Sequence, residues 1–284
     1  MTGTIGNGPK GFALLESKDL KHWNTCDGSA YCMILSPGTA TFGTDMFWAP
    51  QILKDNGNYY LTYSANEQTA LAKSESLYGP YVGVTSNVQP IDGSEKNIDS
   101  FIFKDDDGTY YLYHVRFNHG NYIWVAEFDV EKGIVKSETL KQCLDYTEKW
   151  EKTDNNLWDP IMEGPTVIKM DGMYYMFYSA NHFLNKDYAV GYATAKSPMG
   201  PWTKYEGNPI IHRNIVGENG SGHGDFFVGL DGKPYYVYHV HYSDTEVTPR
   251  RTRIVPLKIK KNKHNGLREI SVDEDNVIVP IISR

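Results

Sequence analysis

The chain has 284 residues, of which 40% are hydrophobic and 22% charged, a composition typical of a globular protein and unlike that of a disordered, collagen-like or coiled-coil chain. Its 28 basic and 35 acidic side chains give a net charge of −7, so the chain lacks the positive field that attracts nucleic acid or an anionic membrane. It contains no run of about 18 apolar residues that would span a bilayer. We therefore expect no nucleic acid and no membrane as a partner, and favour a neutral small molecule or a glycan.

The first predicted element is a strand with an outer turn at residues 16–23. This segment resembles 72–81 and 193–202, but unlike them it follows no complete hairpin. We expect residues 1–4 to be the tail of a hairpin strand, so that the chain begins inside its first repeat unit. The alternative is a looser N-terminal cap with an unrelated conformation.

Three cysteines, Cys26, Cys32 and Cys143, have neither CxxC spacing nor a histidine at metal-ligand spacing. They predict neither a zinc site nor a disulfide framework. A Cys26–Cys32 bridge could close a small loop in an oxidising compartment. Any export signal would lie upstream of Met1, and with such a signal the periplasm or the extracellular space would be favoured.

Four β-hairpins are predicted further along the chain. Each consists of a short apolar run, an Asp/Asn-Gly turn that supplies positive φ, and a tyrosine-rich strand. The tyrosine-rich segments are 57–63, 108–113, 172–178 and 232–238. We interpret their tyrosines mainly as packing between repeat units.

The glycines that open these segments are 51 to 64 residues apart, which is enough for about four strands per unit and matches the size of a propeller blade. With residues 16–23 the number of units is five. Pro and Gly interrupt nearly every window, and no long amphipathic helix is evident. The prediction is an all-β, five-bladed β-propeller that forms one domain over 1–284, with an incomplete first blade. Residues 277–282 are predicted to form an outer strand on the last or the first blade.

Three ionisable residues stand just before predicted inner strands: Asp99, Glu163 and His223. Inner strands of a propeller converge on the axis, so these side chains are expected to share one central pocket. Two carboxyl groups around a sugar-sized pocket are what glycoside hydrolysis requires, because one protonates the leaving oxygen and another activates water or attacks the anomeric carbon. Burial or a neighbouring carboxylate must raise the pKa of the acid.

Together with the five-unit pattern, the phrases at 47–50, 98–100, 163–165 and 222–224 resemble glycoside hydrolase family 43 over roughly residues 1 to 260. The resemblance implies a five-bladed propeller enzyme that acts on arabinose- or xylose-containing plant glycans. An α-L-arabinofuranosidase, a β-xylosidase or an endo-acting relative would each fit. It implies no organic cofactor, and the protein is expected to be a monomer or a weak homo-oligomer.

The same resemblance implies roles for individual residues. Glu163 matches the general acid, and Asp99 the aspartate that raises the pKa of the acid and orients it. His223 matches a histidine at the substrate site, near a calcium ion that it contacts through water. Trp48 matches an aromatic pocket wall.

Two further candidates for substrate binding are less closely defined. Among Arg250, Arg251 and Arg253 we select Arg251 as the substrate-contacting arginine of the fifth blade. Asp45, which lies just before the 47–50 phrase, is a further candidate that matches no residue of the family pattern.

The catalytic base of the family is an aspartate in an Asp-Pro phrase that would lie before Met1, and the Asp-Pro at 159–160 is on the wrong blade. Either Met1 is an internal methionine or the base has been lost. With a base, an inverting mechanism follows. Without it, a catalytically silent glycan-binding propeller is the alternative, and a protein-interaction propeller is a third hypothesis.

Each residue also has a purely structural interpretation. Glu163 could stand in a solvated turn, Asp99 could start an Asx-turn, and His223 and Trp48 could be core residues. We treat His239 and His241 as structural. Tyr31, Tyr188 and Tyr242 are placed in loops and receive no role.

Overall fold

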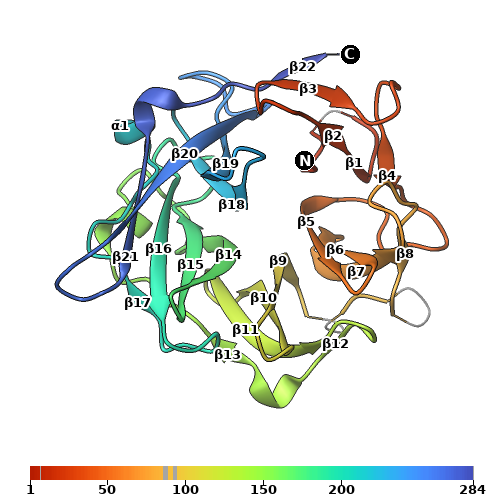
Figure 1. Cartoon of the computed structure of the whole chain (residues 1–284), viewed down its shortest axis with the longest axis horizontal. Helices are drawn as coiled ribbons and strands as arrows, with labels where there is room; N and C mark the ends of the chain where they lie inside the picture. The colour runs from red at the N-terminus through yellow and green to blue at the C-terminus, as the bar shows by residue number, and fades with distance from the viewer. Residues whose placement is uncertain (7, 86–88, 92–94, 284) are drawn as a thin grey trace.

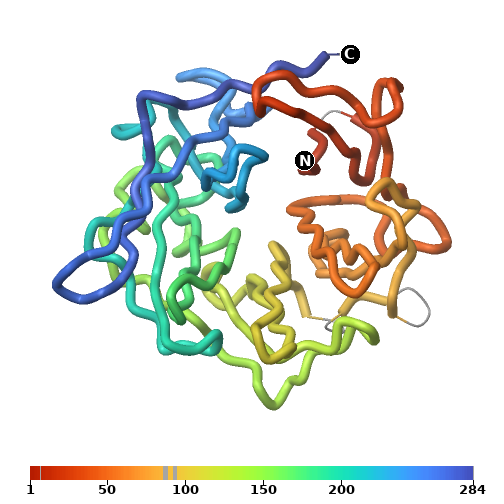
Figure 2. The backbone as a smooth tube through the Cα atoms, in the orientation of Figure 1, coloured from red at the N-terminus to blue at the C-terminus, as the bar shows by residue number. Residues whose placement is uncertain are grey.

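Five small sheets stand in a ring around a common axis in the computed structural model, which describes residues 1–6, 8–85, 89–91 and 95–283 (Figure 1). The strand order in each sheet follows the chain outward from the axis, with β5, β9, β14 and β18 innermost. This arrangement is an all-β, five-bladed β-propeller, as predicted. The smooth trace in Figure 2 shows the chain passing once around the ring.

Four blades have the regular four-strand path. Blade II is β5 (Trp48–Asp55), β6 (Asn58–Ala65), β7 (Gln68–Ser74) and β8 (Val82–Gly83). Blade III is β9 (Asn97–Lys104), β10 (Tyr110–Phe117), β11 (Asn121–Asp129) and β12 (Ile134–Val135), with β13 (Lys141–Gln142) also paired to β11. Blade IV is β14 (Met162–Met170), β15 (Met173–Ala180), β16 (Ala189–Ala195) and β17 (Thr203–Lys204). Blade V is β18 (Gly222–Val228), β19 (Pro234–Val240), β20 (Arg251–Lys261) and β21 (Arg268–Val272).

Helical structure within the described residues is limited to short pieces: the four-residue helix α1 (Arg213–Val216) and the 3₁₀ turns η2 (Ser137–Thr139), η3 (Lys149–Glu151) and η4 (Glu274–Asn276). None of these helices combines the length and the apolarity that crossing a bilayer would require.

The four predicted hairpins are present as β5–β6, β9–β10, β14–β15 and β18–β19. Their turns have the expected chemistry. In the first, Asn56 and Gly57 have φ of 47° and 78°, and in the third, Asp171 and Gly172 have φ of 50° and 76°. Two consecutive positive φ values match the right-handed twist of the flanking strands, which is why Asn-Gly and Asp-Gly recur at these positions.

Blade I is built from both ends of the chain. Its sheet contains β2 (Leu15–Glu16), β3 (His22–Thr25) and β22 (Ile281–Ser283), and β22 runs parallel to β3. The C-terminal segment also bridges to blade V through Ile278 and Ile254. The predicted outer strand is therefore present and joins the last blade to the first. On the axial side of the sheet, Met1 exchanges two backbone hydrogen bonds with Leu15.

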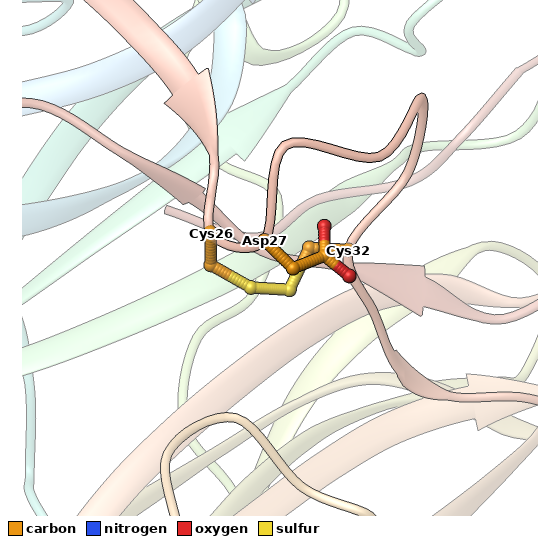
Figure 3. Close-up of side chains that lie close together, drawn as sticks. All are labelled: Cys26, Asp27 and Cys32. Carbon is orange, nitrogen blue, oxygen red and sulfur yellow. A yellow bond between two sulfur atoms is a disulfide. The ribbon is translucent and has the colours of Figure 1, made fainter.

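A separate two-stranded ribbon, β1 (Phe12–Ala13) with β4 (Met33–Leu35), packs with blade II in one hydrophobic cluster. The loop between β3 and β4 is closed by a Cys26–Cys32 disulfide, which spans six residues (Figure 3). Cys143 carries no disulfide. The bridge that the spacing suggested is thus present.

Successive blades are joined by hydrophobic clusters that follow one another around the ring. Blades IV and V share a cluster that includes Tyr175, Tyr192, Tyr236 and Tyr238. A smaller cluster, which contains Trp23, Tyr235 and Ile254, joins blade V to blade I. Most of the repeated tyrosines are buried, and burying such large side chains supplies the main stabilisation between blades.

Ion pairs add to this packing where a hairpin turn meets the next blade. In each, an aspartate of one blade accepts hydrogen bonds from a lysine and a tyrosine of the next, and we call this arrangement a clasp. Asp55 of blade II accepts from Lys104 of blade III at 2.6 Å and from the hydroxyl of Tyr110. Asp105 of blade III accepts in the same way from Lys169 of blade IV at 2.6 Å and from Tyr174. The carboxylate of Asp105 is 9% exposed, so water screens this contact little.

We expect the substitution Asp105→Asn to lower the melting temperature by several degrees, because it removes the charge that Lys169 and Tyr174 face. Asp107→Asn, a loss of the same charge at an exposed position of the same turn, is the matched control and should have little effect. Thermal unfolding followed by circular dichroism measures both. Equal melting temperatures for the two variants would contradict the role of the clasp.

Candidate active site

Each of the four inner strands contains a β-bulge near its axial start. The register of pairing shifts there in β5, β9, β14 and β18. One residue in each bulge has a left-handed backbone: Ala49, Asp99, Gly164 and His223, with φ of 45°, 54°, 60° and 45°. Such values are strained for residues other than glycine, and strain of this kind concentrates at functional sites. The bulges therefore mark the propeller axis as the place to look for chemistry.

A hydroxyl group from the preceding blade holds three of these bulges. The bulge N–H donates to the hydroxyl oxygen in the pairs Ala49–Thr4 at 3.1 Å, Asp99–Ser64 at 3.0 Å and His223–Ser179 at 2.8 Å. Thr4 thus makes the same contact as Ser64 and Ser179, which lie at the ends of tyrosine-rich strands. This equivalence agrees with the expectation that residues 1–4 correspond to the tail of such a strand. In the fourth bulge the N–H of Gly164 donates to the carboxylate of Asp99.

The bulges bring Asp99, Glu163 and His223 together at the axis. One ligand atom from each lies within 4.8 Å of the others, and His223 Nδ1 is 3.7 Å from Asp99 Oδ2. Asp99 is 6% and Glu163 7% exposed. Three residues far apart in sequence therefore form one buried, partly acidic cluster.

Burial and mutual repulsion change the ionisation of this cluster. Burial, with a contribution from the Asp99 charge, raises the pKa of Glu163 to about 7. Burial also raises the pKa of Asp99 to about 7, opposed by the Gly164 N–H and by Arg250. The pKa of His223 is lowered, mainly by desolvation, which favours a neutral imidazole. Because both carboxyls favour their protonated forms, the pair holds a proton near neutral pH.

Two residues without an assigned role in the sequence contact Glu163. The buried hydroxyl of Tyr188 donates to Glu163 Oε1 at 2.7 Å, and the side chain of Asn121, at the start of β11, also bonds this carboxyl. Both hydrogen bonds favour the ionised form and thus oppose the rise in its pKa. Neither residue belongs to the repeated phrases, so no sequence pattern pointed to them.

The structure places Arg250, rather than Arg251, beside the cluster. Arg250 Nη1 lies 2.7 Å from Nε2 of His239, whose ring is 6.5 Å from that of His223. Arg251 instead contacts Glu218 at 3.4 Å and lies over the ring of Tyr242. His239, interpreted from sequence as structural, thus links the arginine to the axis.

The other two candidates, Trp48 and Asp45, differ in their surroundings. Trp48 is partly buried and packs against a hydrophobic cluster formed by blades III and IV. The side chain of Asp45 is 64% exposed and pairs with Lys10 at 3.3 Å. The exposure of Asp45 and its pairing with Lys10 are unlike those of a buried catalytic carboxyl.

The axial cluster offers two carboxylates and one imidazole as ligand atoms, which makes it an acidic group able to hold a metal ion. Calcium takes six to eight oxygen ligands, so these residues alone would not complete its coordination. Because calcium prefers oxygen ligands over the nitrogen of a histidine ring, a contact of His223 through metal-bound water fits calcium better than direct ligation. The second group of this kind, Cys26, Asp27 and Cys32, has its sulfur atoms in the disulfide (Figure 3).

A propeller with paired buried carboxyls at its axis defines a class of protein suited to hydrolysing glycosidic bonds, and comparison with known proteins agrees. A family model for glycosyl hydrolases family 43 matches residues 1–264. The chain belongs to this family.

Solved structures of similar proteins have the same fold. One described as an endo-1,4-beta-xylanase from Bacteroides thetaiotaomicron superposes with a TM-score of 0.88 and 40% identity, over 100% of this chain and 92% of that one. A thermostable family-43 glycoside hydrolase gives a TM-score of 0.79 and 33% identity, over 93% and 85% of the two chains.

Curated relatives are more distant in sequence. A beta-D-galactofuranosidase of Aspergillus niger is 28% identical over 73% of this chain and 60% of its own length. A beta-xylosidase of Xylanibacter ruminicola is 28% identical over 60% of this chain and 58% of its own length. The chain thus spans about three fifths of the length of these two relatives.

Two substitutions should move the pKa of Glu163 in opposite directions, each by about one pH unit. Asp99→Asn removes the neighbouring negative charge and should lower it, and asparagine tolerates the left-handed backbone there. Tyr188→Phe removes a hydrogen bond to the carboxylate and should raise it. Carbon-13 NMR titration of labelled glutamate measures both, with Glu163→Gln as the assignment control. Shifts in the same direction would contradict the geometry.

Proposed function

We propose that the chain is a glycoside hydrolase that cleaves arabinose- or xylose-containing plant glycans, with Glu163 as general acid. The observation that carries the proposal is the buried Asp99–Glu163 pair, which keeps a proton available near neutral pH. The names of relatives support the substrate class, since they include a xylosidase, a xylosidase/arabinosidase and two arabinanases.

In the proposed reaction Glu163 donates its proton to the oxygen of the departing sugar. Tyr188 and Asn121 hold the carboxyl in place and stabilise the carboxylate that remains. Arg250, fixed by His239, is proposed to contact the substrate, in place of Arg251.

Asp99 is proposed to tune and orient Glu163, not to attack the sugar or activate water. Its ligand atom lies within 4.8 Å of that of Glu163. Retaining enzymes separate their two catalytic carboxyls by about 5–5.5 Å and inverting enzymes by about 6.5–9.5 Å, which leaves room for the attacking water. The proposed mechanism is inverting, with a different carboxylate as the base.

Glu163→Gln should lower kcat/KM for xylosides or arabinofuranosides by about 10²–10⁴-fold, the usual contribution of a general acid. The loss should be much smaller for dinitrophenyl glycosides, whose leaving group departs without a proton. In the wild-type chain, kcat/KM should fall as pH rises above about 7, because Glu163 then loses its proton. Colorimetric release of the phenol across a pH series measures all three effects.

An equal loss on both leaving groups would contradict the acid role of Glu163. Saturable binding of pentose oligosaccharides with no turnover would instead support a catalytically silent glycan-binding propeller. Absence of both binding and turnover would reject the assignment to pentose glycans.

We also propose that His223 holds a calcium ion near the axis through water, by accepting a hydrogen bond from a metal-bound water on its neutral ring. The residues present suit a cation, because two carboxyl groups and an imidazole have their ligand atoms within 4.8 Å of one another. Chelation with EDTA should then lower the melting temperature of the wild-type chain, and added calcium should restore it. The same treatment should have less effect on His223→Ala. An unchanged melting temperature after chelation would reject the calcium site.

A further inference from the structure

A pocket with a volume of about 420 Å³ is lined in part by Asn121, and its other lining residues have no role in the chemistry proposed above. One wall is the β10–β11 turn at residues 117–121, and the other is formed by Trp158, Asp159 and Ile161. This volume lies within the usual range of small-ligand sites, about 300–1,000 Å³. Of its lining residues, Asn121 also bonds the carboxyl of Glu163.

Glu163 has one neighbour, Asn121, that lines this pocket and two, Asp99 and His223, in the axial cluster. The ligand atoms of Asp99 and His223 lie within 4.8 Å of that of Glu163, whereas Asn121 bonds the Glu163 carboxyl and lines the pocket. A general acid acts on the oxygen that joins two sugars, so the sugars lie on either side of it. If the cleaved pentose occupies the axial side, the departing unit extends into the pocket.

We propose that this pocket is a leaving-group subsite that binds a second pentose unit of the glycan, with Trp158 as its stacking platform. The inference rests on the proposed function and adds a binding site and a specificity-determining residue to it. Trp158 is 46% exposed and Phe117 43% exposed, so aromatic faces are available to the apolar side of a sugar ring. Asn118 and Asp159 supply polar groups for its hydroxyls.

A continuous series of contacts braces the platform from behind. The Trp158 ring stacks on His182 with centroids 4.3 Å apart and planes 10° apart, and His182 stacks on Phe183 at 4.9 Å. The guanidinium of Arg250 lies 4.9 Å from the centre of the Phe183 ring. Because Arg250 also bonds His239, the platform and the catalytic cluster share one support.

The segment that carries Trp158 is anchored as well. The buried side chain of Asn181 accepts from the N–H of Thr153 at 2.9 Å, and Asp187 accepts from the Thr153 hydroxyl at 2.8 Å. Asn181 and His182 have φ of 95° and 91°. Two adjacent residues with positive φ are costly, and the hydrogen bonds of buried Asn181 and the ring stacking of His182 hold them in this conformation. The platform is therefore set in position before substrate arrives, which lowers the entropy cost of binding.

The test measures binding in a Glu163→Gln background, in which hydrolysis is suppressed. Isothermal titration calorimetry is performed with β-1,4-xylotriose, α-1,5-arabinotriose and the two monosaccharides. Adding Trp158→Ala should weaken binding of the preferred trisaccharide by about tenfold, the effect of losing one good stacking contact, and should leave monosaccharide binding unchanged. Trp158→Phe keeps a stacking ring and should recover most of the affinity.

The matched control is Tyr78→Ala, which removes a 52% exposed aromatic ring that bonds Glu16 of blade I. It should leave trisaccharide affinity unchanged. Trisaccharide binding that survives Trp158→Ala would overturn the subsite while the proposed function stands. A Glu163→Gln parent that binds no pentose oligosaccharide would overturn both. Equal losses for trisaccharide and monosaccharide would place Trp158 outside a leaving-group subsite and overturn the inference.

Discussion

The hydrogen bond between a hydroxyl of one blade and a bulged N–H of the next is the contact on which the site depends. Ser64 holds the bulge at Asp99, and Ser179 holds the one at His223. A regular strand would turn alternate side chains to opposite faces of its sheet. The bulge directs one N–H to the neighbouring blade and one side chain to the axis. The same hydrogen bond therefore holds two blades together and fixes the position of a side chain in the site.

The chemistry of the cluster follows from where these bulges place charge. Asp99 and Glu163 lie in a region that excludes water, where two neighbouring carboxylates cannot both ionise without a large cost. The Gly164 N–H binds the Asp99 carboxylate, and Tyr188 binds Glu163, which keeps the pair from becoming wholly neutral. The result is an acid poised near neutral pH, supported by backbone and hydroxyl donors that do not titrate in that range.

Ring closure extends this arrangement outward from the axis. The stacked rings of Trp158, His182 and Phe183 end on Arg250, which belongs to blade V although Trp158 precedes blade IV. Contacts between blades thus support both the axial cluster and the Trp158 side of the pocket. The clasp at Asp105 and the parallel pairing of β22 with β3 hold the same ring together at its periphery.

Much of the fold could be predicted from the sequence because its signals are local. The Asp-Gly turns and tyrosine-rich strands defined four hairpins, and their spacing indicated five blades; the positions of Asp99, Glu163 and His223 before inner strands predicted their convergence. The role of Tyr188 and the choice of Arg250 among three candidate arginines were not predictable, since both residues lie outside the repeats and reach the site only through contacts with other blades. Hairpin turns depend on the conformational preferences of neighbouring residues, which any sequence displays. Which arginine faces the axis, and which hydroxyl meets the acid, depends on how five separate sheets pack, and that packing exists only in the closed ring.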